Sequence, residues 1–251
     1  MKKTLTLFIS LLFSVLSYGQ SNELTDKEKL KLYPDKEKVS PFHNDWTQNN
    51  YPKRIDLFRD NPLEKGDIVF IGNSITQQGA DWSEKFGIAH IRNRGIAGDV
   101  TDGVLMRLDE VVFFQPKAVF ILIGINDLFS LHYEDGDKRF SYKKLVPSTK
   151  YVANNIVKIA RIIQRKSPNT KIFVRTVLPT RRDFLKDDIV SLNELIRKNE
   201  SRGYYTLIDL YHQFVDDNGD MMKELTKDGV HLNEDGYENW VKFEKLILES
   251  L

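Results

Sequence analysis

Uninterrupted hydrophobic runs alternate along the chain with segments in which hydrophobic residues recur at helical spacing. The runs that are typical of buried strands lie at 68–71, 118–123, 172–174 and 206–208, with a weaker one at 89–91. The amphipathic segments predict helices at 101–112, 148–165, 187–201 and from Asn233 to the C-terminus, with Thr101 and Asn233 as caps of the first and last. Strands that are hydrophobic on both faces need helices on both sides, so the pattern predicts one α/β domain with a parallel sheet.

The first 19 residues have a different pattern, which is typical of a signal peptide. Lys2 and Lys3 precede a mostly apolar run at 5–16, and the small residues Ser17 and Gly19 flank Tyr18. The alternative is a membrane anchor, but the run is shorter than the roughly 18 to 20 apolar residues that a spanning helix needs. We therefore expect a cleavable signal, a secreted or periplasmic protein, and no stable membrane insertion after cleavage.

Residues 20–62 connect this segment to the predicted domain. Their first part is rich in Lys, Glu and Asp, which predicts an exposed polar leader. A short lead-in helix is expected to start near Pro52 and to end by Asn61 and Pro62. The α/β domain is then expected to span residues 63–251.

Composition narrows the function classes. The chain has 251 residues with 37 Lys and Arg against 36 Asp and Glu, and this balance argues against a nucleic-acid partner, which would favour a basic excess. The absence of Cys excludes disulfides, thiolate metal sites and a cysteine nucleophile. The chain also lacks the motifs of zincins, P-loop enzymes and dinucleotide-binding folds. Thr76 occupies the place of the second glycine of a Gly-x-Ser-x-Gly elbow, which disfavours an ordinary α/β-hydrolase.

Ser74 follows the first predicted strand, at the sheet edge where parallel sheets bind ligands. It is a candidate nucleophile, and a helix cap is an equally good interpretation of this serine alone. Near the C-terminus, Asp228 and His231 are three residues apart in a predicted turn. A carboxylate there can hold one imidazole nitrogen and leave the other free as a base.

Two further loops end at the same edge of the predicted sheet. Gly98 lies in a glycine-containing turn, and its small size can let a backbone N–H approach a ligand oxygen. Asn126 ends the most hydrophobic strand, where it can cap a helix or donate its side-chain amide to an oxyanion. Asp127 is expected either to support the Asn126 loop by hydrogen bonding or to cap a helix.

Taken in order, Ser74, Gly98, Asn126 and His231 resemble the four-block signature of the SGNH (GDSL-type) hydrolases, over about residues 67–240. The segment 94–108 resembles the platelet-activating-factor acetylhydrolase catalytic-subunit branch of that family. The segment 70–76 equally resembles secreted bacterial sialate O-acetylesterases and related sugar deacetylases. Asn73 departs from the Asp that many relatives have before the nucleophile, a change that bears on tuning and substrate preference.

The resemblance implies a flavodoxin-like three-layer α/β/α domain and ester hydrolysis through an acyl-enzyme. In that mechanism Ser74 is the nucleophile, His231 the base and Asp228 its partner, and no metal or organic cofactor is needed. The oxyanion hole would consist of the N–H groups of Ser74 and Gly98 and the side chain of Asn126, with Asn73 and Asp127 in support.

The substrate is expected to be an O-acetyl ester on a carbohydrate such as sialic acid, with segment 129–146 as a wall of the cleft. Candidate wall residues are Leu131, His132, Tyr133, Asp135, Arg139, Phe140 and Tyr142. One alternative is a lysophospholipase or a platelet-activating-factor-type lipid acetylhydrolase. Another, of a different class, is a non-catalytic glycan-binding module on the same fold. The sequence does not define the oligomeric state.

Overall fold

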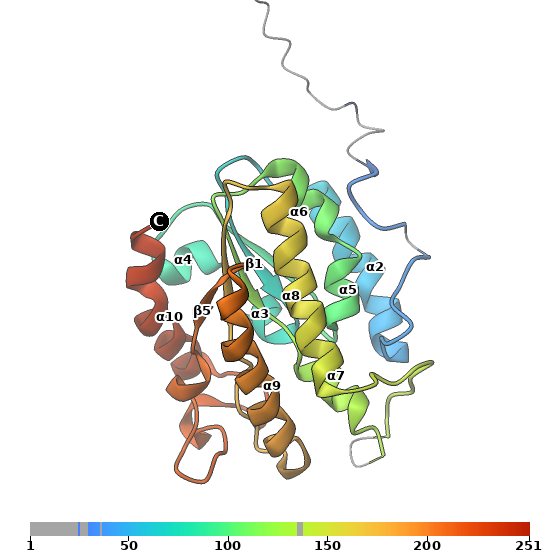
Figure 1. The fold of residues 1–251 in the computed structure, drawn as a ribbon, viewed down its shortest axis with the longest axis vertical. Helices are drawn as coiled ribbons and strands as arrows, with labels where there is room; N and C mark the ends of the chain where they lie inside the picture. Colours follow the sequence, from blue (N-terminus) through green and yellow to red (C-terminus); the bar gives the residue numbers. More distant parts are fainter. Residues whose placement is uncertain (1–24, 26–29, 36, 135–137) are drawn as a thin grey trace, which may run out of the picture.

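A computed structural model describes residues 25, 30–35, 37–134 and 138–251, so the predicted signal segment 1–19 lies outside the described residues. Five parallel strands form one sheet in the order β2-β1-β3-β4-β5 (Figure 1). Their bounds are Ile68–Gly72 (β1), Ile91–Gly95 (β2), Ala118–Leu122 (β3), Lys171–Arg175 (β4) and Thr206–Ile208 (β5). The predicted single α/β domain with a parallel sheet is confirmed.

Helices cover both faces of the sheet (Figure 1). On one face lie α5 (Thr101–Leu105), α6 (Leu108–Phe114), α8 (Thr149–Lys166) and α9 (Lys186–Asn199). On the other lie α3 (Ser74–Gln78), α4 (Trp82–Phe86) and α10 (Glu234–Glu249). The remaining helices are α2 (Asp45–Asp60), α7 (Ile125–Leu131) and four 3₁₀ turns, η1 (Asp183–Leu185), η2 (Glu200–Arg202), η3 (Tyr211–Gln213) and η4 (Lys223–Leu225). No helix of the described residues is both long and hydrophobic enough to cross a membrane.

Successive side chains of the central strands point to opposite faces of the sheet, and both faces are covered by helices, so their sequences are hydrophobic throughout. Val69 and Ile71 of β1 pack in the cluster beneath α8 and α9, whereas Ile68 and Phe70 pack in the cluster beneath α4 and α10. All five residues of β1 and of β3 are buried. Both faces of a strand can be buried in this way only when helices cover both sides.

The second strand differs from its prediction. The weak run at 89–91 was expected to be a strand, but β2 spans Ile91–Gly95. β2 is an edge strand, and its two arginines form ion pairs: Arg92 with Asp67 (3.0 Å) and Arg94 with Glu110 (2.7 Å). Polar side chains with such partners are tolerated at a sheet edge, so a search for hydrophobic runs did not detect this strand.

The helix expected at 101–112 is divided into α5 and α6. The division lies at Arg107, whose buried side chain turns inward to Asp99 (Nε to Oδ2, 3.0 Å) and to the carbonyl of Arg94 (2.8 Å). Thr101 is not the cap of α5, because Val100 occupies that position and the Thr101 hydroxyl donates to Asp127 (2.6 Å). The predicted cap of the last helix is confirmed, since Asn233 caps α10, and the helix expected from about residue 148 begins after Ser148, which caps α8.

The lead-in helix is longer than expected and is packed against the domain. α2 begins at Asp45 rather than near Pro52, because the Asn44 side chain accepts a hydrogen bond from the N–H of Thr47 (2.7 Å) and Pro52 is accommodated inside the helix. The Tyr51 hydroxyl donates to the carbonyl of Gly103 (2.8 Å). Residues before 63 are therefore not only a leader, since α2 is part of the folded body.

Candidate active site

Ser74 lies at the carboxyl end of β1, as the first residue of α3. The alternative interpretation of this serine as a helix cap is wrong, because Asn73 is the cap of α3 and its Oδ1 accepts from the N–H of Ile75 (3.0 Å). Asn73 thus supports the turn, and the Ser74 hydroxyl is available for another partner.

That partner is His231, from the loop before α10. The distance from His231 Nε2 to Ser74 Oγ is 3.0 Å, and the distance from His231 Nδ1 to Asp228 Oδ2 is 2.7 Å. Ser74 is 7% exposed, whereas the imidazole is 26% exposed. The structure therefore places a hydroxyl, an imidazole and a carboxylate in one hydrogen-bonded line, open to a ligand from the solvent side.

Asp228 is held in its ionised form by the same loop. Partial burial raises the pKa of the Asp228 carboxyl, but this is outweighed by hydrogen bonds from the N–H groups of His231 (2.8 Å) and Val230 (3.0 Å) and from the imidazole. Together they hold its pKa below the ordinary value. A carboxylate beside Nδ1 fixes the tautomer that leaves Nε2 free to accept the serine proton.

Gly98 lies in the turn after β2, where the backbone requires glycine. Its φ of +80° is a left-handed conformation that other residues rarely adopt. A Cβ at this position would lie 1.9 Å from Oγ1 of Thr47, on α2. The turn therefore packs directly on the lead-in helix, and its glycine is needed both for backbone conformation and for close packing.

Asn126 lies near the start of α7 and lines the same pocket as Ser74 and His231. It is not the helix cap, which is Gly124. Its Nδ2 donates to the carbonyl of Asp99 (2.9 Å), which fixes the amide and leaves its second N–H for a ligand oxygen.

Asp127 connects this loop to α5 rather than capping a helix. Its carboxylate accepts hydrogen bonds from the N–H (3.0 Å) and the hydroxyl (2.6 Å) of Thr101. Asp127 is fully buried, and this burial raises the pKa of its carboxyl to about 8. Asp127 therefore joins the loop that carries Gly98 to the loop that carries Asn126, which is a supporting role of the kind predicted.

The raised pKa of Asp127 predicts a pH-dependent stability. Between about pH 4 and pH 8 the folded protein retains a proton that the unfolded chain has released, so the free energy of unfolding should fall as the pH rises through this window. In wild type this decrease in the free energy of unfolding should be of the order of a few kcal/mol, and in Asp127→Asn it should be absent. Urea unfolding at pH 5 to 9 measures it, with Asp109→Asn, an exposed carboxylate on α6, as the control. A fall of unchanged size in Asp127→Asn would contradict the expectation.

The pocket over the triad has a volume of about 250 Å³, and one wall of it is aromatic, with four Phe and Tyr side chains among twelve lining residues. As expected, segment 129–146 supplies much of it: Phe129, Tyr133, Arg139, Phe140 and Tyr142. Two of the candidate wall residues do not line the pocket. Leu131 packs against the hydrophobic core, and His132 Nε2 pairs with Asp188 Oδ2 (2.5 Å). Asp135 lies outside the described residues.

Three pocket residues were not identified from the sequence, namely Asn44, Arg182 and Val230, the last of which lies between Asp228 and His231. Asn44 precedes α2, and its cap position was the signal that would have revealed the helix start. An isolated β-bridge between Asn44 and Tyr142 joins this residue to the aromatic wall. Arg182 follows β4 in a loop without a recognisable motif.

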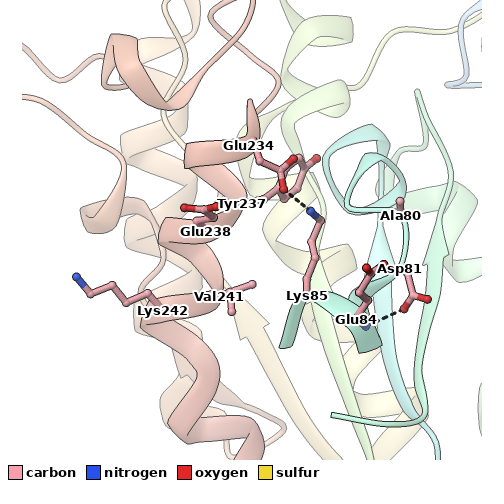
Figure 2. Close-up of a pocket in the computed structure, with 9 residues that line it drawn as sticks. All are labelled: Ala80, Asp81, Glu84, Lys85, Glu234, Tyr237, Glu238, Val241 and Lys242. Carbon is pink, nitrogen blue, oxygen red and sulfur yellow. Dashed lines mark hydrogen bonds and ion pairs between the residues drawn. The ribbon is translucent and has the colours of Figure 1, made fainter. Parts of the chain in front are cut away.

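A larger hollow of about 610 Å³ lies between α4 and α10 (Figure 2). Its floor is formed by Tyr237 and Val241, and Lys85 pairs with Glu234 across it (2.9 Å). None of the nine residues that line it is a serine or a histidine. The serine and histidine needed as nucleophile and base therefore lie in the smaller pocket, over Ser74, and not in this larger hollow.

Comparisons with known proteins identify the family that this chain resembles. The model of the GDSL-like lipase/acylhydrolase family matches residues 70–238. Human platelet-activating factor acetylhydrolase IB subunit alpha2 is 28% identical over 194 residues, which cover 74% of this chain and 77% of the relative. A Streptococcus pneumonia structure named after platelet activating factor has a TM-score of 0.67 and 26% identity, covering 81% of this chain and 94% of its own. A GDSL-like lipase of Bacteroides thetaiotaomicron has a TM-score of 0.66 at 24% identity, covering 80% and 98%.

Proposed function

The chain belongs to the GDSL-like lipase/acylhydrolase family and is a carboxylic-ester hydrolase, and from this premise we propose that it removes acetyl groups from carbohydrates through an acyl-enzyme on Ser74. The observation that carries the proposal is the line from Ser74 Oγ to His231 Nε2 (3.0 Å) and from Nδ1 to Asp228 (2.7 Å). This is the arrangement that a serine hydroxyl needs to lose its proton as it attacks a carbonyl carbon.

In the first half of the reaction, Ser74 Oγ attacks the ester carbonyl and His231 Nε2 takes the hydroxyl proton. The carbonyl oxygen becomes an anion, held by the N–H groups of Ser74 and Gly98 and by the free N–H of the Asn126 amide. Each such donor typically contributes about 3 to 4 kcal/mol of transition-state stabilisation. Collapse of the intermediate breaks the ester bond, and the imidazolium gives its proton to the leaving alcohol.

The second half repeats these steps with water. His231 removes a proton from a water molecule, which attacks the acetyl carbonyl on Ser74. The same donors hold the second oxyanion, and the proton returns to Ser74 Oγ as acetate leaves. Asp228 remains ionised throughout and stabilises the imidazolium, for which its lowered pKa suits it.

The composition of the pocket supports an acetylated sugar as the substrate, with sialic acid as one candidate. Its volume of about 250 Å³ is small, and its aromatic rings alternate with polar groups from Asn44, Asn126 and Arg182. Aromatic faces with a few oriented polar groups suit a sugar ring. A second candidate is a lipid carrying a short acyl ester, which is favoured by the 28% identity to the human platelet-activating factor acetylhydrolase subunit.

We also propose that the protein acts outside the cytoplasm, in the periplasm or the medium. Lys2 and Lys3, the apolar run at 5–16 and the small residues near Gly19 support this location.

Acyl-chain selectivity tests the proposal. The protein is expected to hydrolyse p-nitrophenyl acetate with a kcat/KM at least about tenfold above that for the octanoate, because the polar side chains of Asn44, Asn126 and Arg182 in the pocket lining disfavour a long hydrocarbon chain. Acetate release from at least one acetylated carbohydrate, either O-acetylated sialic acid or acetylated xylo-oligosaccharides, is also expected. A preference for octanoate, or turnover of an acetylated choline phospholipid without turnover of either sugar, would favour the lipid candidate.

A further inference from the structure

The pocket over Ser74 borders a second hollow. Two residues, Arg182 and Asp228, line both the catalytic pocket and a neighbouring groove of about 370 Å³. The groove lies between the loop after β4 and the loop before α10, and its other lining residues are Arg181, Lys223, Thr226, Lys227 and Gly229. A ligand chain whose ester occupies the catalytic pocket can therefore extend past Arg182 into this groove.

The groove is strongly basic, although the chain as a whole has a formal charge of only +1. Four of its seven lining residues are Arg or Lys, and its single carboxylate, Asp228, is engaged by His231. Arg182 Nη2 donates to the backbone carbonyl of Asp228 (3.1 Å), and Lys227 Nζ donates to the side-chain amide oxygen of Gln78 (2.6 Å). Neutral acceptors of this kind orient the two side chains without cancelling their charge.

The remaining basic groups differ in their surroundings. Arg181 Nη1 lies 3.5 Å from Asp216 and donates to the carbonyl of Met221 (2.8 Å), so part of its charge is compensated. Lys223 is exposed at the rim. The groove therefore retains an excess of positive charge beside the catalytic centre.

The backbone holds this basic surface in a fixed place. The N–H of Arg181 donates to the carbonyl of Gly229 (2.7 Å), which joins the two loops. Gly229 has a φ of +83°, and a Cβ there would lie 3.0 Å from Cβ of Arg181 and 3.2 Å from Nη1 of Arg182. The glycine thus allows both arginines to lie closely over the loop that carries Asp228 and His231.

We propose that this groove is a subsite for an anionic glycan chain, so that the substrate is an acetyl ester on a carboxylate-bearing polysaccharide rather than on a neutral one. The inference rests on the proposed function and specifies its substrate class. The acetylated sugar occupies the pocket over Ser74, and carboxylates of neighbouring sugars pair with Arg182, Lys223 and Lys227.

A glycan fits this groove better than a lipid does. None of its seven lining residues has a hydrophobic side chain, so the apolar surface of the groove comes mainly from the hydrocarbon stems of Arg and Lys, whose charged ends remain beside any ligand. Guanidinium and ammonium groups at the rim instead favour carboxylates, with which Arg forms paired hydrogen bonds.

The test compares acetate release from an O-acetylated oligogalacturonate and from its carboxyl-reduced form, which has the same sugars without the charges. An O-acetylated oligosialate serves as a second acidic probe and distinguishes uronate from sialate as the source of the carboxylate. We expect kcat/KM on at least one acidic probe to exceed that on the reduced form. The preference should decline between 50 and 500 mM salt, roughly as the Debye length shortens.

Charge variants locate the effect. Lys223→Gln/Lys227→Gln should reduce the ratio of acidic to reduced turnover by about tenfold, since two rim charges at roughly 0.7 kcal/mol each correspond to that factor. Lys242→Gln, at the separate hollow between α4 and α10, is the matched control and should leave the ratio unchanged. The ratio is measured within each variant, so a general loss of activity does not imitate the result.

Several outcomes would overturn the inference. Equal turnover of acidic and reduced probes, or a preference that persists in the double variant, would show that the groove does not bind the glycan, while p-nitrophenyl acetate hydrolysis would still support the esterase. A double variant impaired only on an acetylated choline phospholipid would assign the groove to a lipid phosphate. Folded protein that hydrolyses no ester would instead refute the proposed function.

Discussion

Ser74→Ala is expected to lower kcat on p-nitrophenyl acetate by roughly 10⁵- to 10⁶-fold, the scale seen when a triad serine is removed. The reason is that Ser74 Oγ is the hydroxyl positioned at His231 Nε2, and without it no acyl-enzyme can form. Steady-state hydrolysis by the purified variant, with the wild-type protein at the same concentration, measures the loss. The variant should keep its fold, because Asn73 rather than Ser74 caps α3.

The control is Ser201→Ala, an exposed serine in η2 that should leave kcat unchanged. His231→Ala should lose about as much activity as Ser74→Ala, and the double variant little more, since the two groups act as one unit. Activity in Ser74→Ala within tenfold of wild type would exclude Ser74 as the nucleophile.

Glu244→Gln is expected to lower the free energy of unfolding by about 3 to 5 kcal/mol, because it leaves a buried cation without its counter-charge. Arg175 and Glu244 are both fully buried, and they form two hydrogen bonds of 2.8 and 2.7 Å between β4 and α10. The Arg175 guanidinium also lies over three aromatic rings. Its Cζ is 4.2 Å from the ring centroid of Phe70, 4.9 Å from that of Phe120 and 4.8 Å from that of Trp240.

Urea unfolding monitored by circular dichroism measures this change. Glu238→Gln, the same substitution on the exposed face of α10, should shift the free energy by less than about 0.5 kcal/mol. Arg175→Met/Glu244→Leu should recover most of the loss, because it replaces both charges by hydrophobic groups. A Glu244→Gln variant as stable as Glu238→Gln would mean that the ion pair contributes nothing to the fold.

The sequence predicted the central strands well, because hydrophobic burial alone determines them. β1 and β3 are buried at every position, so their composition is visible without knowledge of the fold. β2 was misplaced because Arg92 and Arg94 owe their positions to Asp67 and Glu110, which are distant in sequence. Ion pairs between residues far apart in the sequence leave no local hydrophobic or polar pattern from which a strand can be predicted.

The site was predictable to the extent that its residues lie in short motifs. Asp228 and His231 are three residues apart, and their contact follows from a turn. Asn44 and Arg182 reach the pocket from α2 and from the loop after β4, and only the packing of the whole domain brings them there. Asn126 was assigned two possible roles, and the cap at Gly124 removed one of them.

The packing of Thr47 beneath Gly98 links the beginning of the chain to the catalytic centre, just as the loop at 228–231 links its end. A polypeptide that is synthesised or exported from its N-terminus has α2 available early but lacks the imidazole until nearly all of its residues have emerged. A chain that stops before residue 228 lacks the base and its partner, and a chain without α2 lacks the helix on which the Gly98 turn packs. Because Ser74 and His231 are 157 residues apart, we expect esterase activity to appear only after the C-terminal loop has packed against the sheet edge.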